Sequence, residues 1–360
     1  MAREQTVFSE LAVARGISKN NLQEIKNVNG EAITKYNAEK NKRITSTDIT
    51  KSTSEAALES SGLLVRNWLL NTKKITNINV EWIAGDASKD GSSVAKDLII
   101  SNTNIRVSVK ENAQLFQNPS PVQVFQKWPQ GVLFTNAKDE DWFIKVAEKE
   151  LNDYFVICGG TQFTKYKTVK EYYKNVKGKE LVNGKEVKKR KLFTEHVAAL
   201  HVNKSPNVIS AYKTFCKKVS EESAKEFNKN ILATFPSWQG TSTNIGLLTN
   251  LFSVFFKLDN TEYVLAGTEN NKAFAVVVHD ITTWRNKYSI KKIEAKALVA
   301  GQPEVLINFE FIEIATSKEF SYGIKCEVRW SHGKFCGNPE SKLYKYNHWK
   351  YEDLPWVNVL

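Results

Sequence analysis

An aspartate and a lysine lie on two neighbouring predicted strands. Asp97 begins the candidate strand 97–101, and Lys110 lies near the end of the candidate strand 105–112. The short polar turn 102–104 between these strands predicts a β-hairpin. Asp97 and Lys110 are nearly equidistant from the centre of that turn. Both side chains are therefore expected at the open end of the hairpin.

The residue types around this pair indicate a divalent-metal site. Because side chains alternate along a strand, Ser108 and Lys110 are expected on one side and Val109 in the core. The Asp97 carboxylate and the Val109 backbone carbonyl offer the oxygen ligands that Mg²⁺ prefers. Such an ion acidifies a water and offsets charge on a phosphate. Lys110 would orient that water or stabilise the phosphate centre.

The combination of Asp97 with Ser108-Val109-Lys110 resembles the PD-(D/E)xK nuclease superfamily, to which many type II restriction endonucleases belong. The resemblance implies a mixed β-sheet nuclease core, Mg²⁺ as cofactor, Asp97 as the first acid and Lys110 as the terminal lysine. The chain departs from the pattern at Ser108, where the superfamily has its second acid. Some members carry Ser-x-Lys and recruit an acid from a nearby helix.

Several acids could take the missing position. The predicted helix 52–71 contains Glu55 and Glu59, and Glu59 is preferred because Glu55 matches a capping box with Ser52. Glu111 is adjacent to Lys110, but it is expected to point to the opposite side of the strand. Asp86, at the end of the preceding candidate strand, is a further option.

These residues belong to a chain of 360 residues, which suggests one large domain or two moderate ones. The pattern of elements predicts an α/β fold: a mixed β-sheet nuclease core flanked by helices, with a second, strand-containing DNA-binding lobe. We place the helical N-terminus and catalytic core in 1–156 and the basic, strand-rich recognition lobe in 157–360. The lobe's main expected elements are a helix at 205–232 and strands at 262–267, 273–280, 305–314 and 323–330.

The charge of the chain favours a polyanionic partner. Lys and Arg number 51 against 39 Asp and Glu, a net charge of +12, and segment 164–191 carries +8 of it. Basic proteins bind nucleic acids because neutralised phosphates release counterions. Inside the segment, Asn183-Gly184 predicts a hairpin with a type I′ turn. The expected phosphate contacts are Lys185, Lys188, Lys189 and Arg190.

A second resemblance concerns residues 326–349, which are similar to a segment near the end of some type II restriction endonucleases, including HaeIII-like ones. It implies that a strand end and a glycine-rich loop contact DNA. Arg329 would bind guanine bidentately, and the neighbouring polar groups would add contacts. The alternative left open is that Arg329 pairs with an acid inside the fold. The residues expected here are Arg329, Ser331, His332, Lys334 and Asn338.

Other classes of protein are disfavoured. No stretch approaches the roughly eighteen apolar residues of a membrane span, and the N-terminus lacks an apolar signal-peptide core. Four cysteines are too few for a disulfide scaffold, and the absence of CxxC spacing disfavours zinc near Cys326 and Cys336. We therefore expect a cytoplasmic protein with no membrane partner.

The expected function is a Mg²⁺-dependent, site-specific endonuclease for double-stranded DNA, a type II restriction enzyme. Two alternatives stay open. One is a non-catalytic nucleic-acid-binding protein, and the other is a metal-dependent nuclease of repair or phage origin. Whether the chain acts as a homodimer is also left open.

Overall fold

The computed structural model describes residues 4–45, 55–83, 97–111, 115–133, 141–182, 185–236, 242–298, 301–347 and 349–360, with the backbone alone described at 115–117, 182, 185 and 242–245. The chain forms two compact units. The first unit comprises Met1–Gln114, Phe252–Tyr288 and His348–Leu360, and the second unit comprises Leu115–Leu251 and Ser289–Asn347.

This division differs from the expected boundary near residue 157. The second unit begins at Leu115, and two later segments of the chain return to complete the first unit. The physical reason lies in the sheet of the first unit, which needs strands from beyond residue 252 to pair with its N-terminal strands. A single boundary along the sequence cannot describe a unit that is built from three separate segments.

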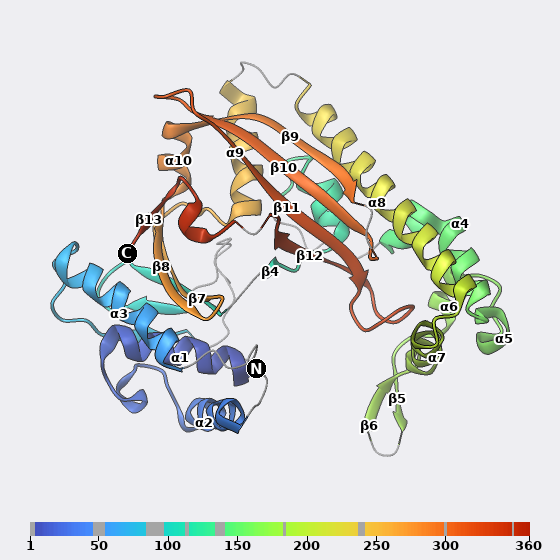
Figure 1. The fold of residues 1–360 in the computed structure, drawn as a ribbon, viewed down its shortest axis with the longest axis horizontal. Coiled ribbons are helices and arrows are strands. Elements are labelled where there is room, and N and C mark those ends of the chain that lie inside the picture. Colours follow the sequence, from blue (N-terminus) through green and yellow to red (C-terminus); the bar gives the residue numbers. More distant parts are fainter. Residues whose placement is uncertain are drawn as a thin grey trace. The chain divides into compact units, whose positions relative to one another are not determined.

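The first unit is a mixed β-sheet with helices (Figure 1). Its sheet has the strand order β1-β2-β3-β7-β8-β13, in which β3 and β7 are parallel and the other neighbours are antiparallel. The elements are α1 (Glu4–Ser18), α2 (Gly30–Thr45), α3 (Glu55–Asn71), β1 (Val80–Trp82), β2 (Leu98–Ile100), β3 (Arg106–Glu111), β7 (Tyr263–Glu269), β8 (Lys272–Val278), α10 (Ile281–Lys287) and β13 (Val357–Val359), with 3-10 turns at Leu22–Glu24 and Tyr351–Asp353.

Helices α1 and α3 share one apolar core with this sheet. The core combines residues of α1 such as Phe8 and Leu11 with Val107 and Val109 of β3. The two helices approach very closely, because a Cβ atom built on Gly62 would lie 2.3 Å from the carbonyl oxygen of Val13. This close packing fixes α1 over the sheet, and α1 in turn carries an acid described below.

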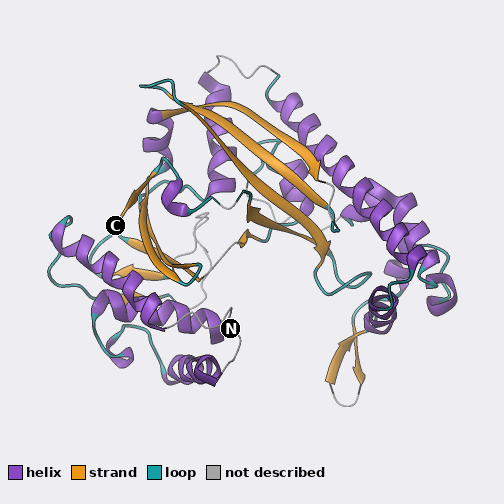
Figure 2. Ribbon diagram, in the orientation of Figure 1, coloured by secondary structure: helices purple, strands orange, loops and turns teal. Residues whose placement is uncertain are grey.

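The second unit contains a long curved sheet covered by helices (Figure 2). Its five strands have the order β4-β12-β11-β10-β9. The elements are β4 (Leu115–Gln117), a π-helix (Gln123–Lys127), α4 (Trp142–Ile157), α5 (Gly160–Thr164), α6 (Val169–Asn175), β5 (Lys179–Val182), β6 (Lys185–Lys188), α7 (Lys191–Val202), α8 (Pro206–Thr234), α9 (Ser242–Phe256), β9 (Tyr288–Leu298), β10 (Glu304–Glu313), β11 (Glu319–Trp330) and β12 (Pro339–Lys345). Helix α9 runs from the second unit into the first.

The predicted hairpin within 164–191 is present as β5 and β6, an isolated two-stranded ribbon that extends away from the helices of its unit (Figure 2). The mixed α/β class and the helix at 205–232 are confirmed, the latter as α8. The predicted strands at 262–267, 273–280, 305–314 and 323–330 correspond to β7, β8, β10 and β11. None of the described helices has the length and apolarity that crossing a membrane requires.

Candidate functional site

Asp97 lies where β2 and β3 part, and two groups of β3 hold its carboxylate. The Asp97 amide donates to the Val107 carbonyl at 3.2 Å. Beyond it, Oδ2 of Asp97 accepts the Val109 amide at 2.6 Å and the Ser108 hydroxyl at 3.2 Å. Ser108 is 2% exposed. Its side chain therefore orients the aspartate, a role that needs no acid at that position.

Lys110 follows on the same strand, in the parallel pair with β7. Its partner in register is Gly267, where a Cβ atom would lie 1.6 Å from the Lys110 carbonyl oxygen. Gly267 has a φ of 152°, a conformation that glycine adopts readily and other residues rarely do. The glycine thus allows β7 to support the backbone of Lys110. Lys110 is half-buried and forms no ion pair within the described residues.

Glu10, on α1, is a buried acid within electrostatic range of Asp97 and Lys110, and the sequence analysis did not identify it. It is 6% exposed, and its Oε2 accepts a hydrogen bond from Nε1 of Trp82 at 2.7 Å. Burial, and then the negative charge of Asp97, raise the pKa of Glu10 to about 8, while the Trp82 hydrogen bond and the Lys110 charge oppose the rise. A signal was available, because Glu10 interrupts an apolar helical stretch and glutamate is seldom buried unpaired.

A second lysine lies near this cluster. Burial, and then the like charge of Lys110, lower the pKa of Lys257 to about 8. Lys257 follows α9 with a φ of 60°, and its carbonyl accepts the Tyr263 hydroxyl at 3.0 Å. Helix α9 and β7 therefore bring a second amine toward the end of β3, from a segment about 150 residues away in the sequence.

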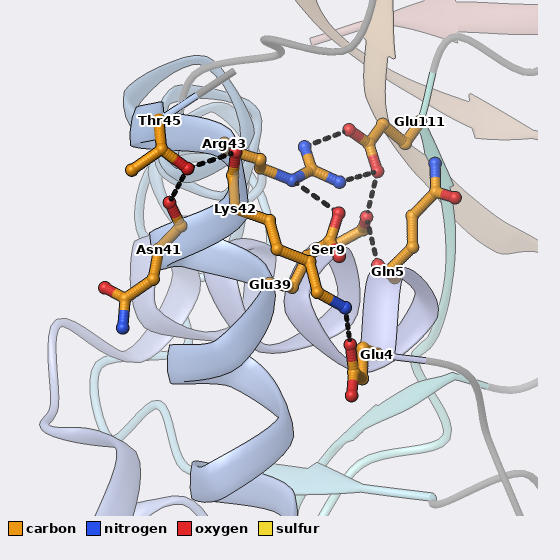
Figure 3. A network of polar contacts seen from close by, with 9 residues as sticks. All are labelled: Glu4, Gln5, Ser9, Glu39, Asn41, Lys42, Arg43, Thr45 and Glu111. Carbon is orange, nitrogen blue, oxygen red and sulfur yellow. Dashed lines mark hydrogen bonds and ion pairs between the residues drawn. The ribbon is translucent and has the colours of Figure 1, made fainter.

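The acids considered from the sequence lie elsewhere or are engaged. Glu59, the preferred candidate, is not brought to Asp97, because it forms an ion pair with Arg15 at 3.0 Å. Glu55 binds the same arginine at 2.5 Å, and its expected cap partner Ser52 lies outside the described residues. Glu111 is on the opposite side of the strand, as expected, and pairs with Arg43 (Figure 3).

Asp86, the remaining option, also lies outside the described residues. Among the described acids named above, Glu10 on α1 is the one whose pKa the charge of Asp97 raises. Glu59 lies on α3, where its backbone contacts α1 through Gly16.

The donor set of Glu10 and Asp97 fits a magnesium ion. Mg²⁺ is commonly bound by one or two carboxylates and completes its shell with waters and substrate phosphates. The described residues hold no group of three or more His, Cys, Asp or Glu that could bind a metal, so two carboxylates would carry the protein's share. Oε1 of Glu10 receives no hydrogen bond from the described residues. The buried Glu10 and the half-buried Asp97 repel each other when both are ionised, and a divalent cation between them would relieve that repulsion.

The second unit carries a basic surface around α6 and the hairpin. Its lysines at Lys165, Lys167, Lys170, Lys174, Lys177 and Lys189 are exposed, and Lys188 is half-buried. None of the seven forms an ion pair with any residue that the structure describes, whereas Lys179 of β5 pairs with Glu186 at 2.6 Å. Nothing is described of the Lys185 side chain. Among the residues that the structure describes, no carboxylate therefore neutralises these seven cations.

Two residues expected to contact DNA, Arg190 and Lys334, have partners within the fold, and their contact with DNA stays a prediction. Arg190 donates to the carbonyls of Val176 at 2.6 Å and Tyr173 at 2.7 Å, and its guanidinium lies 4.2 Å from the Tyr173 ring centroid. It thereby ties the end of the hairpin to α6. The amine of Lys334 lies 4.6 Å from the Tyr212 ring centroid, and burial lowers its pKa.

Arg329, at the end of β11, has carboxylate partners within the fold but remains partly exposed. Arg329 has two carboxylate partners, Glu340 at 3.3 Å and Glu327 at 3.7 Å, which is the structural alternative left open from the sequence. Its side chain is 44% exposed, so base recognition stays a prediction. The turn after β11 leaves His332 and Asn338 exposed and Ser331 half-buried, and Ser331 donates its amide to the Asn338 carbonyl at 3.1 Å.

The four cysteines are all buried and unpaired: Cys158, Cys216, Cys326 and Cys336.

Comparison with protein-family models, with curated proteins and with solved structures finds no match for this chain.

Proposed function

We propose that the protein is a Mg²⁺-dependent endonuclease that hydrolyses phosphodiester bonds in double-stranded DNA, with the site-specific action of a type II restriction enzyme. The observation that carries the proposal is that Asp97 is held by Ser108 and the Val109 amide next to Lys110 on β3. The buried Glu10 of α1 lies close enough for the charges of Asp97 and Lys110 to shift its pKa. Two acids with an adjacent lysine suit phosphoryl chemistry better than simple binding, because carboxylates repel phosphates unless a cation lies between them.

Each residue has a definite task in this mechanism. Glu10 and Asp97 would hold Mg²⁺, which when bound activates a water and offsets charge on the phosphate. Ser108 and the Val109 amide keep the Asp97 carboxylate in one orientation. The Lys110 ammonium donates a hydrogen bond to the attacking water or to a non-bridging phosphate oxygen. Lys257 adds positive charge beside Lys110, where negative charge grows in the transition state.

The basic surface of the second unit supports nucleic acid as the substrate class. Residues 164–191 carry a net charge of +8 of the chain's +12, and the seven lysines named above have no carboxylate partner in the described part of the chain. Exposed lysines of this kind bind phosphates irrespective of base sequence. A two-stranded ribbon such as β5–β6 also has a width that the major groove of B-DNA admits.

The test is a digest of unmethylated phage DNA with Mg²⁺, with Mn²⁺ and with excess EDTA. Discrete fragments that require the metal are expected. A smear would indicate a non-specific nuclease, intact but retarded DNA would indicate a binding protein, and full cleavage in EDTA would refute the metal mechanism. The matched pair of variants is Glu10→Gln, expected to be inactive, and Glu59→Gln, expected to cleave.

A further inference from the structure

A buried ion-pair network joins α2 to the end of β3 (Figure 3). Arg43 and Glu111 have side chains that are 8% and 9% exposed. The arginine donates from both terminal nitrogens to the Glu111 carboxylate, one of the two bonds at 3.0 Å, and from Nε to Glu39 at 3.0 Å. Its guanidinium carbon lies 4.2 Å from the Phe8 ring centroid. Each of the three guanidinium nitrogens therefore donates to a carboxylate.

The same network reaches α1. The Ser9 hydroxyl donates to Glu111, and its oxygen lies 2.8 Å from the Gln5 carbonyl of the preceding helical turn. Ser9 is the neighbour of Glu10 in the chain, and Glu111 is the neighbour of Lys110. Arg43 thus holds Glu111, the neighbour of Lys110, directly, and reaches Ser9, the neighbour of Glu10, through the Glu111 carboxylate. Its own atoms touch neither of those groups in any described contact.

The network is poorly explained as a device for stability. A buried ion pair often contributes little net stability, because desolvation of the charges offsets their attraction. Helices α1 and α2 are already joined by the stacked rings of Phe8 and Tyr36, 5.0 Å apart. A bidentate arginine also fixes the orientation of its partner carboxylate, because both oxygens of Glu111 are held in the plane of the guanidinium. That direction is supplied at the last residue of β3, where the sheet pairing ends.

We propose that Arg43 is a positioning residue of the site: by fixing Glu111 and Ser9 it sets the placement of Lys110 on β3 relative to Glu10 on α1. This inference rests on the proposed function. Removing a group that hydrogen-bonds to a metal ligand typically lowers metal affinity or activity by about 10–100-fold. Arg43 acts one step further out, through the chain neighbours of the ligand and the lysine.

Two variants separate positioning from stability. Arg43→Met leaves Glu111 buried without its partner, so both the melting temperature and kcat should fall. Arg43→Met combined with Glu111→Leu removes both charges, and such replacement of a buried pair is often neutral or stabilising. Positioning therefore predicts that the double variant regains the melting temperature and keeps a kcat that is lower by about 10–100-fold. The KM for DNA should remain within about twofold, because Arg43 belongs to the first unit and the basic surface to the second.

The matched control is Arg15→Met, which removes another arginine that joins helices of the first unit. Arg15 binds Glu55 and Tyr36, and its described contacts do not include β3. Its loss should lower the melting temperature and leave kcat within about twofold, measured below the transition of every variant.

Mn²⁺ titrated calorimetrically into each protein, without DNA, gives a second readout. The Arg43 double variant should bind Mn²⁺ more weakly than wild type. Recovery of kcat together with the melting temperature, or a kcat loss in Arg15→Met as large as in Arg43→Met, would overturn the inference while leaving the proposed function intact. If the wild type neither binds Mn²⁺ nor cleaves DNA, the proposed function fails, and the inference fails with it.

Discussion

Replacing Glu10 with glutamine is expected to stabilise the protein in the absence of metal and to abolish cleavage. The carboxyl of Glu10 is buried beside Asp97, and its pKa is raised to about 8 from an ordinary value of 4.5. The folded state therefore favours the protonated, neutral form. Glutamine is neutral at every pH, and its side-chain oxygen can still accept the hydrogen bond of Trp82 Nε1.

The size of the effect follows from linkage between ionisation and folding. The pKa of Glu10 is higher in the folded protein than in the unfolded chain. The contribution of the protonated Glu10 carboxyl to the free energy of unfolding is therefore fully present below pH 4.5 and is lost as pH rises through 8. At 1.36 kcal/mol per pKa unit, the loss is about 3 kcal/mol at pH 7 and approaches about 5 kcal/mol above pH 8. At pH 5 it is about 1 kcal/mol, since that pH is only about half a unit above the unfolded pKa of 4.5 while the folded carboxyl is protonated.

The assay compares the free energy of unfolding of wild type and Glu10→Gln in EDTA at pH 5 and pH 8. The difference between the two proteins isolates Glu10 from other groups that titrate in this range. The variant should be similar to wild type at pH 5 and more stable at pH 8. Addition of Ca²⁺ at pH 8 should stabilise wild type, because it binds the ionised pair, and should stabilise the variant far less.

Two results would refute this reasoning. A variant that is less stable than wild type at pH 8 would mean that Glu10 is ionised and favourably paired in the folded protein. A variant that cleaves DNA at the wild-type rate would remove Glu10 from the metal site, whatever its stability. Glu59→Gln serves as the control for both measurements, since its carboxyl pairs with Arg15 away from Asp97.

The remaining predictions concern the amine, the supporting glycine and the basic surface. Lys110→Ala should lose cleavage by orders of magnitude and keep DNA binding in Ca²⁺ within about tenfold, as measured by anisotropy, because it serves chemistry more than affinity. Gly267→Ala should lower both the melting temperature and kcat, since the added methyl group would meet the Lys110 carbonyl at 1.6 Å; unchanged values would show that β7 does not support this strand. Lys188→Ala with Lys189→Ala should weaken binding to all sequences alike and reduce the log–log salt slope by about 2, whereas Lys225→Ala, whose amine pairs with Glu222 at 2.7 Å, should leave the slope unchanged.

Local patterns in the sequence were enough to predict the hairpin that carries Asp97 and Lys110. The alternation of residues 106–110, the polar turn before them and the acid at the start of 97–101 depend on neighbours a few positions away. The same holds for the ribbon β5–β6, whose register is set by its own turn. Backbone periodicity and turn chemistry act over short distances, so a single sequence exposes them.

The composition of each unit and the partners of individual charges depended on the tertiary structure. The parallel pairing of β3 with β7 joins residues 107–111 to 264–268, and no local pattern indicates which distant strand completes a sheet. Arg329 and Arg190 had the same sequence features as DNA-contacting arginines. In the folded protein, Arg329 pairs with two carboxylates, whereas Arg190 donates to two backbone carbonyls.

The sequence by itself determined the chemistry available: an acid and a lysine on adjacent strands, a serine between them, and a basic segment outside. The tertiary structure decided which second acid joins them. Glu10 and Glu59 both lie on helices packed closely against each other, yet burial beside Trp82 brings Glu10 to Asp97, and Arg15 holds Glu59. Helical periodicity indicates which face of a helix is apolar, but the position of that helix over a sheet depends on packing between distant segments. Such packing depends on side-chain shape over the whole core, and no short stretch of sequence contains it.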